Sequence, residues 1–338
     1  MDKETVADLH KGLFTLVFSS PEAIMSPTWW EWVRLNRKKI ALLCIDEAHC
    51  LTKCHVKLLS NRGETFRDHY LSITELGSRL PKTPVMMLTA TATPVMVEQI
   101  IGHMHLKQDA VVYVTLLPDR PNIHLEVKTV NIKSFEDTLG WYLAELKSKV
   151  DSAPKAIIYA RQVDQVGEIY HWLMRELGSS AFAIDTPAEV HNRTVEMYHA
   201  ATDVDSQRRI ASTIADTTSS IRCVVATIAF GLGINISNVD YVLHWGPSGD
   251  IMSYWQEVGR CARDGRVGKA ILYIYPGSID KRRVDEPMRN FLLSAQTGEQ
   301  CIRKSILQFL FLPGMNVKSL EHCSAIPSCC SVCNKEKK

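Results

Sequence analysis

The fold class of the chain follows most directly from the sequence Ile40-Ala-Leu-Leu-Cys-Ile-Asp-Glu-Ala-His49. Its first six residues are all apolar and predict a buried strand that ends in two adjacent carboxylates. Extending such a strand into Asp46-Glu47 is costly unless a cation or a polar substrate receives the charges. In nucleotide hydrolases an Asp at this place holds Mg²⁺, and the following Glu orients the attacking water. A bare Asp-Glu pair also has a simpler explanation, in which the strand leaves the core and its acids are solvated.

Short apolar runs rich in β-branched residues recur along the chain, with longer amphipathic stretches between them. Several runs have no polar alternation, which is typical of a parallel sheet covered on both faces. The stretches at 134–150 and 163–177 have apolar residues at every third or fourth position and predict helices. The other expected strands are Phe14–Phe18, Val85–Leu88, Val111–Val114, Ile157–Tyr159, Cys223–Ala226, Tyr241–His244 and Ala270–Tyr275. This alternation predicts an α/β fold with parallel sheets, and functional loops at the carboxyl ends of the strands.

Composition limits the classes of protein to which the chain can belong. Its 338 residues are 46% hydrophobic and 22% charged, which excludes a disordered or collagenous protein. The 39 basic and 37 acidic residues nearly balance, so any contact with nucleic acid must come from particular loops. No apolar stretch is long enough to cross a bilayer and the amino terminus carries no export signal, so we expect a soluble intracellular protein.

Two changes along the sequence divide the chain. The prolines of Pro118-Asp-Arg-Pro121 interrupt both helix and strand pairing. After Pro276 the strand pattern stops, and a basic segment and a cysteine-rich tail follow. We therefore expect a first lobe over residues 1–118, a second lobe over 119–276 and a small module over 277–338.

The acidic strand end also matches a known motif. Asp46-Glu47-Ala48-His49-Cys50 resembles motif II of the RecQ family of superfamily 2 DNA helicases. Thr89-Ala90-Thr91 resembles motif III, which links ATP hydrolysis to movement between lobes, and Arg120-Pro121-Asn122-Ile123 is similar to the interlobe segment. The resemblance covers nearly the whole chain and implies two RecA-like lobes that use ATP. It also implies that Asp46 holds Mg²⁺ and that Glu47 and His49 belong to the catalytic site.

A further motif of the family follows an expected strand of the second lobe. Residues 226–235, Ala-Thr-Ile-Ala-Phe-Gly-Leu-Gly-Ile-Asn, resemble motif V, in which glycines let the backbone approach a phosphate or a nucleic-acid strand. The resemblance implies that Thr227 contacts DNA and that Gly231 and Gly233 bind the nucleotide. Gly-x-Gly alone is weak evidence, because turns commonly use it. Asn235 stands where the family often has Asp.

Residues 256–265, Gln-Glu-Val-Gly-Arg-Cys-Ala-Arg-Asp-Gly, resemble motif VI. Two arginines three residues apart on one helical face can reach a triphosphate bound by the opposite lobe. By resemblance Arg263 is the arginine finger that neutralises charge on the transferred phosphoryl group, Arg260 is its companion, and Gln256 relays the nucleotide state. A solvated basic helix would also explain the two arginines, but it leaves the Gln and the glycines unexplained.

The carboxyl-terminal tail is rich in cysteines, and the polar residues around them offer no core. Cys330-Ser-Val-Cys333 has the spacing that lets two thiolates hold one tetrahedral ion. Cys301, Cys323, Cys330 and Cys333 are the candidate ligands of one structural Zn²⁺, and the RecQ zinc module has this layout of one helix-borne cysteine and three clustered ones. Cys329 is a further thiol that could replace Cys330, so both remain candidates. A redox-active pair lacks its usual strand-then-helix context here.

The chain departs from the family in its first lobe. It contains no Gly-x-x-x-x-Gly-Lys-[Ser/Thr] sequence, the loop that cradles the β-phosphate. In the family that loop precedes the point at which this chain begins, which predicts an amino-terminally truncated first lobe. The family's aromatic loop is matched only in its later half, where Phe66 could stack on a base and Arg67 could contact a phosphate. Phe66 is equally well explained as a packing residue.

These residues lead to one main hypothesis and two alternatives. The resemblance implies an ATP- and Mg²⁺-dependent DNA helicase, located in the nucleus, that moves 3′ to 5′ on single-stranded or junction-containing DNA and carries Zn²⁺ in its tail. The first alternative is a catalytically impaired DNA-binding fragment with a zinc-stabilised tail, which the missing phosphate loop favours. A nucleotide-independent zinc scaffold for proteins is a weaker third class.

Overall fold

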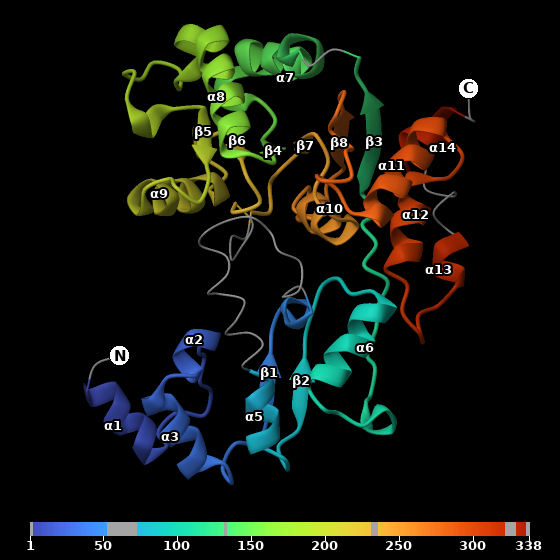
Figure 1. The fold of residues 1–338 in the computed structure, drawn as a ribbon. Coiled ribbons are helices and arrows are strands. Elements are labelled where there is room, and N and C mark those ends of the chain that lie inside the picture. The colour runs from blue at the N-terminus through green and yellow to red at the C-terminus, as the bar shows by residue number, and fades with distance from the viewer. Residues whose placement is uncertain (1–2, 53–72, 132–133, 231–235, 322–328, 336–338) are drawn as a thin grey trace. The chain divides into compact units, whose positions relative to one another are not determined.

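The computed structural model describes residues 3–52, 73–131, 134–230, 236–321 and 329–335 of the chain. It divides into two compact units, one formed by residues 1–116 and 311–314 and the other by residues 117–310 and 315–338 (Figure 1). Both units combine helices with parallel strands, as the sequence predicts. Most of the segment 277–338 is grouped with the second lobe.

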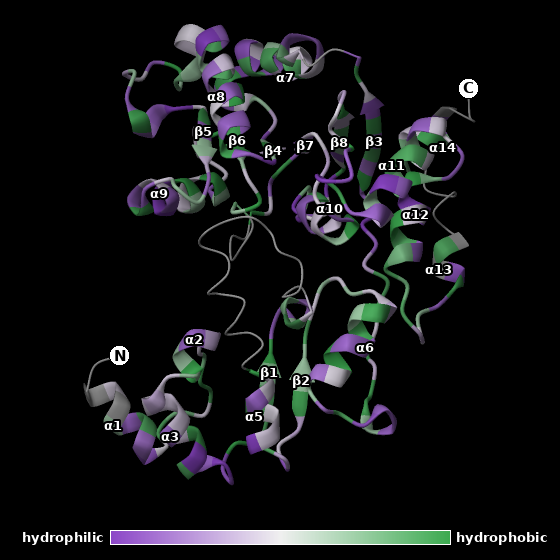
Figure 2. Ribbon diagram, in the orientation of Figure 1, coloured by the Kyte–Doolittle hydropathy of each residue, from purple (hydrophilic) through white to green (hydrophobic). Residues whose placement is uncertain are grey.

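The first unit contains two parallel strands and short helices. Ile45 of β1 lies opposite Met87 of β2, and Ile45 packs in a core with Val33 of α3 and Ile100 of α6. Figure 2 shows β1 and β2 in the green of hydrophobic residues. The elements are α1 (Lys3–Lys11), α2 (Pro21–Ile24), α3 (Pro27–Asn36), β1 (Leu43–Ile45), η1 (Ala48–Leu51), α5 (Thr74–Arg79), β2 (Val85–Met87), α6 (Pro94–His103) and η3 (Gln108–Ala110).

Two of the expected strands of this unit are not formed. The runs Phe14–Phe18 and Val111–Val114 have no strand structure, so these two predictions were wrong. A strand requires a neighbour for its backbone groups, and among the described residues β1 and β2 pair only with each other. The side chains of the two runs are accordingly exposed, with exposed fractions of 86% at Phe18 and 94% at Val114.

The second unit is built on a parallel sheet of six strands in the order β3-β8-β7-β4-β6-β5 (Figure 1). Helices α7 and α8 confirm the two helices predicted from the sequence. The edge strands β3 and β5 were not predicted, because charged residues interrupt their apolar pattern. The elements up to the last strand are β3 (Ile123–Thr129), α7 (Phe135–Lys149), η4 (Val150–Ser152), β4 (Ala156–Ala160), α8 (Val163–Leu177), η5 (Gly178–Ala181), η6 (Val190–Asn192), β5 (Val195–Tyr198), α9 (Val204–Ala215), β6 (Cys223–Ala226), β7 (Tyr241–Trp245), α10 (Ile251–Val258) and β8 (Gly268–Ile274).

Strand β4 lies in the interior of this sheet, and all of its residues are buried. Leu143 of α7 and Leu173 of α8 pack in the same core as Ile158 of β4. Full burial of one such aliphatic side chain stabilises the fold by about 1.5–3 kcal/mol. The continuous apolar sequence of the central strands is thus explained by cover from helices. Helix α9, in contrast, shows both purple and green in Figure 2, and its polar side faces water.

The described residues of the carboxyl-terminal segment form α11 (Glu286–Thr297), α12 (Ile302–Phe309), α13 (Lys318–Glu321) and α14 (Ser331–Lys335). Gly298 ends α11 with a φ of 76°, a left-handed conformation that favours glycine. Cys330 then forms a bridge to Leu125 of the edge strand β3, which brings the tail back to the sheet. In the part of the chain that the structure describes, no helix combines the length and apolar character needed to cross a membrane.

Candidate functional site

The two acids of the first unit lie directly after β1, at the carboxyl end of the strand. Asp46 is exposed, and its Oδ1 accepts the amide N–H of Glu47 at 2.8 Å. Glu47 has a left-handed backbone with a φ of 50°, so the chain turns sharply here. The second oxygen of Asp46 takes no part in this turn and suits a hard cation such as Mg²⁺, which prefers oxygen ligands.

The structure joins these acids to the expected coupling residues. His49 Nδ1 lies 3.0 Å from Thr89 Oγ1 and 3.1 Å from Glu47 Oε2. Thr89 donates its hydroxyl proton to the carbonyl oxygen of Thr91 at 2.8 Å, so the N–H of His49 is the donor toward Thr89. Ala90, between the two threonines, is exposed. The contact follows from the pairing of β1 with β2, because the carboxyl ends of parallel neighbours meet at one edge.

The surroundings of His49 keep its imidazole protonated. Burial lowers the pKa of His49, but hydrogen bonds and charges from Cys50 and Glu47 outweigh this effect and raise the pKa to about 9. A buried imidazolium between Glu47 and Thr89 is therefore a fixed electrostatic link between the two motifs at neutral pH.

In the second unit, Arg260 and Arg263 lie in the turns after α10, which we call the arginine turn (residues 259–264). The sequence predicts both on one helical face, but the helix ends at Val258, so that detail was wrong. The N–H of Ala262 bonds instead to the carbonyl oxygen of Val239 at 2.7 Å, with a left-handed φ of 46° at Ala262. The backbone of the arginine turn thus bonds to the segment just before β7 instead of continuing the hydrogen bonds of a helix.

A guanidinium group from the segment before β3 holds the arginine turn. Arg120 Nη1 donates to the carbonyl oxygen of Gly259 at 2.8 Å, and its Nη2 donates to those of Cys261 and Ala262, each at 2.9 Å. Asn122 Nδ2 also donates to the carbonyl oxygen of Ala262, at 2.9 Å. Carbonyl groups at a helix end need such donors, and charged donors bind them more strongly than neutral ones. Arg120 and Asn122 are therefore positioning residues that hold the backbone of the arginine turn. The motif Arg120-Pro121-Asn122-Ile123 does not by itself reveal this role.

The arginine turn concentrates positive charge. Partial burial and repulsion from Arg260 and Arg120 lower the pKa of Arg263, which still stays charged at physiological pH. Arg260 lies near Tyr159 of β4, and burial raises the pKa of Tyr159, so its hydroxyl stays protonated. Three guanidinium groups in one place favour an anionic ligand such as a phosphate.

Gln256, the expected relay, is half-buried on the last turn of α10, next to a buried polar network. Glu257 Oε2 accepts the hydroxyl proton of Ser248 and lies 2.8 Å from Nε2 of His244. The His244 ring stacks on Tyr159 with centroids 5.4 Å apart. The network therefore fixes α10 against the ends of β4 and β7. In the sequence, the feature that indicates such a network is an acid, Glu257, on the apolar face of α10.

Thr227, the expected DNA contact, lies half-buried directly after β6 at the carboxyl edge of the sheet. Its amide N–H donates to the carbonyl oxygen of Tyr198 at 3.1 Å, which fixes its position beside β5. Four other expected residues lie outside the described residues, and their roles stay predictions: Phe66, Arg67, Gly231 and Gly233.

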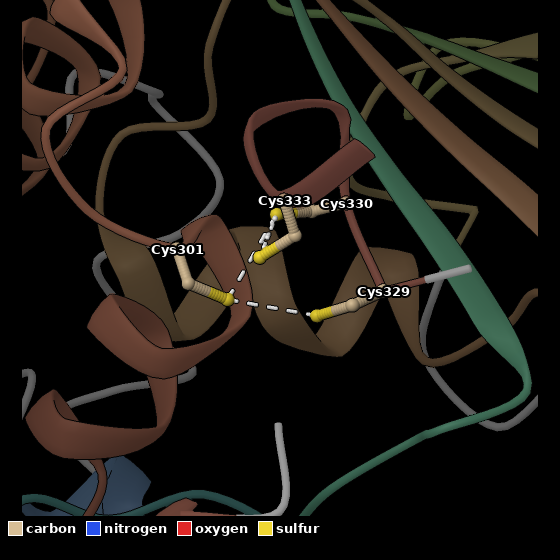
Figure 3. A group of neighbouring side chains, drawn as sticks. All are labelled: Cys301, Cys329, Cys330 and Cys333. Carbon is tan, nitrogen blue, oxygen red and sulfur yellow. Dashed lines mark hydrogen bonds between the residues drawn. The ribbon is translucent and has the colours of Figure 1, made fainter. Parts of the chain in front are cut away.

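Four cysteine thiols meet in the tail (Figure 3). The Sγ atoms of Cys301, Cys329, Cys330 and Cys333 all lie within 4.8 Å of one another. Neighbouring pairs are 3.5 to 3.8 Å apart. A tetrahedral Zn²⁺ with Zn–S bonds of about 2.3 Å needs sulfurs about 3.8 Å apart, so the cluster fits this ion. Cys323 of the expected set lies outside the described residues, whereas Cys329 joins Cys330 in the cluster rather than replacing it.

Arg303 is fully buried beside this cysteine cluster. Its Nη1 donates to Asp119 Oδ1 at 2.8 Å and to the carbonyl oxygen of Arg120 at 2.7 Å, and its Nη2 donates to the carbonyl oxygens of Ile123 and Cys329. Because Arg120 holds the arginine turn, one path of hydrogen bonds joins the cysteine cluster to that turn. The sequence signal that could have found Arg303 is a single cation on the apolar face of α12.

Two α/β units, one with an acidic strand end and the other with an arginine turn, define the class of superfamily 2 helicases. Residues 140–265 match the family model of the helicase conserved C-terminal domain. The chain is 33% identical over 268 residues to the ATP-dependent DNA helicase RecQ of Pasteurella multocida, covering 79% of this chain and 37% of that protein. It is 28% identical to the bifunctional 3′-5′ exonuclease/ATP-dependent helicase WRN of Mus musculus, covering 98% of this chain and 23% of that protein. The chain belongs to the RecQ family of helicases.

Solved structures of helicases have the same fold. S. cerevisiae Dbp5 bound to RNA and ADP BeF3 is similar with a TM-score of 0.51 at 17% identity, over 85% of this chain and 63% of that one. The DEAD-box helicase Mss116 bound to ssRNA and UDP-BeF is similar with a TM-score of 0.59 at 15% identity, over 96% of this chain and 58% of that one. The chain spans 37% to 38% of the length of the bacterial RecQ proteins that it matches.

Proposed function

We propose that the chain carries the coupling and arginine-bearing parts of a RecQ-type, ATP-dependent DNA helicase that moves 3′ to 5′ in the nucleus. The contact of His49 with both Glu47 and Thr89 carries this proposal, because it links the water-orienting acid to the coupling segment. Identity to proteins named as RecQ DNA helicases supports DNA as the nucleic acid. When bound, ATP supplies the phosphoryl group and Mg²⁺ neutralises its oxygens.

Each group of residues has a role in this proposal. Asp46 would hold Mg²⁺, and Glu47 would orient the water for attack on the γ-phosphate. His49 transmits a shift of Thr89, Ala90 and Thr91 to Glu47. Arg263 neutralises charge on the transferred phosphoryl group, supported by Arg260 and Gln256. Thr227 contacts the DNA strand, and Gly231, Gly233, Phe66 and Arg67 keep their expected roles toward nucleotide and DNA.

We expect the substitution Glu47→Gln to abolish DNA-stimulated ATP hydrolysis. The amide keeps the size of the side chain but cannot accept a proton from water, and losing such a group lowers the rate by about 10²–10⁴-fold. The measurement is phosphate release by the full chain with and without single-stranded DNA. The matched control is Glu145→Gln, an acid of α7 that pairs with Lys149 on its own helix and should hydrolyse ATP like the wild type.

Two results would contradict the helicase proposal. Equal hydrolysis by Glu47→Gln and wild type would remove Glu47 from the mechanism. No hydrolysis by the wild type, with DNA binding that weakens as salt rises, would instead identify the chain as a DNA-binding module.

The cysteine cluster supports a structural zinc site in the same protein. Cys301, Cys329, Cys330 and Cys333 would hold the ion through four thiolates, a closed set that leaves no position for a substrate. The ion would fix α12 and α14 against β3, since Cys301 opens α12 and Cys330 bridges to β3. Zinc is thus proposed as a structural ion that supports the second lobe.

We expect metal analysis to find one zinc ion per wild-type chain and almost none in Cys333→Ser. The four clustered thiols complete a tetrahedral site, so Cys329→Ser should also lose the ion whereas Cys323→Ser should keep it. Cys44→Ser, at an exposed cysteine outside the cluster, is the control and should keep the ion. Unchanged zinc in Cys333→Ser would reject the site, and zinc lost only in Cys323→Ser would restore the ligand set predicted from the sequence.

A further inference from the structure

A basic hollow lies at the carboxyl edge of the sheet in the second unit. It has a volume of about 170 Å³, and its lining includes Arg161, Gly246, Tyr275 and Arg283. Arg161 directly follows β4, Gly246 directly follows β7 and Tyr275 directly follows β8. Strands β4 and β7 are neighbours in the sheet. From β4 the chain continues to β5 at one edge, and from β7 it continues to β8 in the opposite direction along the strand order. Ligands of α/β sheets bind at such a switch point, outside the carboxyl ends of the strands.

The floor of the hollow is closed by two buried rings. Gly246 has a φ of 82°, and a Cβ atom there would lie 3.0 Å from the hydroxyl oxygen of Tyr275, so only glycine lets the backbone approach this ring. Trp245 and Tyr275 are only 1% and 6% exposed. The floor therefore presents no free aromatic face on which a base could stack.

The walls carry positive charge that the protein leaves largely uncompensated. Partial burial and the charge of Arg283 lower the pKa of Arg161, while Tyr275, Asp250 and Glu257 act in the opposite direction. Asp250 is engaged at the start of α10, where it accepts the amide N–H of Ser253 at 2.8 Å, and Glu257 is bound within the buried network. In the part of the chain that the structure describes, no carboxylate forms an ion pair with Arg161 or Arg283.

A second basic hollow adjoins the first. It has a volume of about 480 Å³ and is lined by Lys281, Arg282 and Arg289, and Arg282 also lines the first hollow. Asp280 lies 3.8 Å from Arg282 in an exposed pair, which screens that charge only weakly. Five cationic side chains thus line the two hollows: Arg161, Arg283, Arg282, Lys281 and Arg289.

We propose that these two hollows bind successive phosphates of a DNA strand. The first is smaller than the roughly 300 Å³ at which pockets for small organic ligands begin, so it fits a phosphate group better than a whole nucleotide. Two adjoining cationic hollows match a chain of phosphates, whereas a single phosphorylated molecule would need only one. This inference rests on the proposed DNA-binding function and extends it to residues outside the motifs II, III, V and VI described above.

The test is DNA binding by the full chain, measured by the anisotropy of a labelled single strand over a range of salt concentrations. Each of Arg161→Gln and Arg283→Gln should weaken binding by about fivefold near 0.1 M salt and reduce the salt slope by about 0.7. Lysine at either position should restore most of the affinity, because a phosphate contact of this kind depends on charge. Arg175→Gln is the matched control, an exposed arginine on the last turn of α8, away from the end of β4.

The possible outcomes separate this inference from the function on which it rests. No DNA binding by the wild type would overturn both. Wild-type binding that Arg161→Gln and Arg283→Gln weaken no more than Arg175→Gln would overturn the phosphate track alone. Loss of affinity for inorganic phosphate or ATP without loss of affinity for DNA would also overturn it, in favour of a site for free phosphates. An equal loss on RNA and DNA strands would support contact with the backbone.

Discussion

Replacing Arg263 by alanine is expected to lower the rate of DNA-stimulated ATP hydrolysis by about 10³–10⁵-fold, the range that an arginine finger contributes in related phosphoryl transfers. The structure gives two reasons for choosing this residue. Its side chain is exposed, and Arg120 holds the arginine turn on which it lies through short bonds to the backbone carbonyls of Gly259 and Cys261. A phosphate can therefore reach the side chain of Arg263 from solvent.

Two variants of Arg263 distinguish a loss of catalysis from a loss of folding. Arg263→Ala should keep most of the wild-type free energy of unfolding and its affinity for DNA, since the residue is exposed and the bond from its Nε to the carbonyl oxygen of Gly259 is long, at 3.3 Å. Arg263→Lys should recover only part of the rate, because an ammonium group cannot make the paired contacts of a guanidinium. Steady-state hydrolysis at saturating ATP and DNA measures the effect. A loss smaller than tenfold in Arg263→Ala would exclude it as the finger.

The sequence predicts the interior of the second lobe well, and physical reasons explain where it fails. Strands β4, β6 and β7 are continuous apolar runs because they are buried, and that property is local to the sequence. Phe14–Phe18 is equally apolar, but a strand also needs a partner for its backbone groups, and apolar sequence does not supply one. The edge strands β3 and β5 are the opposite case, because pairing to one neighbour holds them despite their charged residues.

The same limit applies to the candidate sites. Asp46-Glu47 and Cys330-x-x-Cys333 could be proposed from the sequence because their chemistry depends on residues close together in the chain. The contact of Arg120 with Gly259 joins residues 139 positions apart, and that of Arg303 with Asp119 joins residues 184 positions apart. Such side-chain bonds depend on how the strands and helices pack, so a single sequence gives only indirect signals of them.

Replacing the buried Arg303 is expected to have a large effect on the stability of the second unit. We expect Arg303→Ala to lower the free energy of unfolding by about 3–5 kcal/mol, because it leaves the Asp119 carboxylate without its buried partner. Three backbone carbonyls also lose a charged donor, although those of Arg120 and Cys329 still accept the amide N–H of Ile123 and Leu125, so this loss adds only modestly to the cost. Urea unfolding followed by circular dichroism is the measurement. Lys304→Ala is the matched control, an exposed cation one position along α12, and should change stability by no more than about 0.5 kcal/mol.

A second readout distinguishes a link to the arginine turn from simple packing. Arg303 holds the backbone of Arg120, and Arg120 holds the turn that carries Arg263, so loosening the first contact should disorder the last. At a temperature at which the variant is still folded, Arg303→Met should therefore hydrolyse ATP more slowly than Lys304→Ala, although methionine refills most of the volume. If Arg303→Met retains the wild-type rate, the hydrogen bonds of Arg303 stabilise the tail alone. A stability of Arg303→Ala equal to that of Lys304→Ala would contradict the buried pair itself.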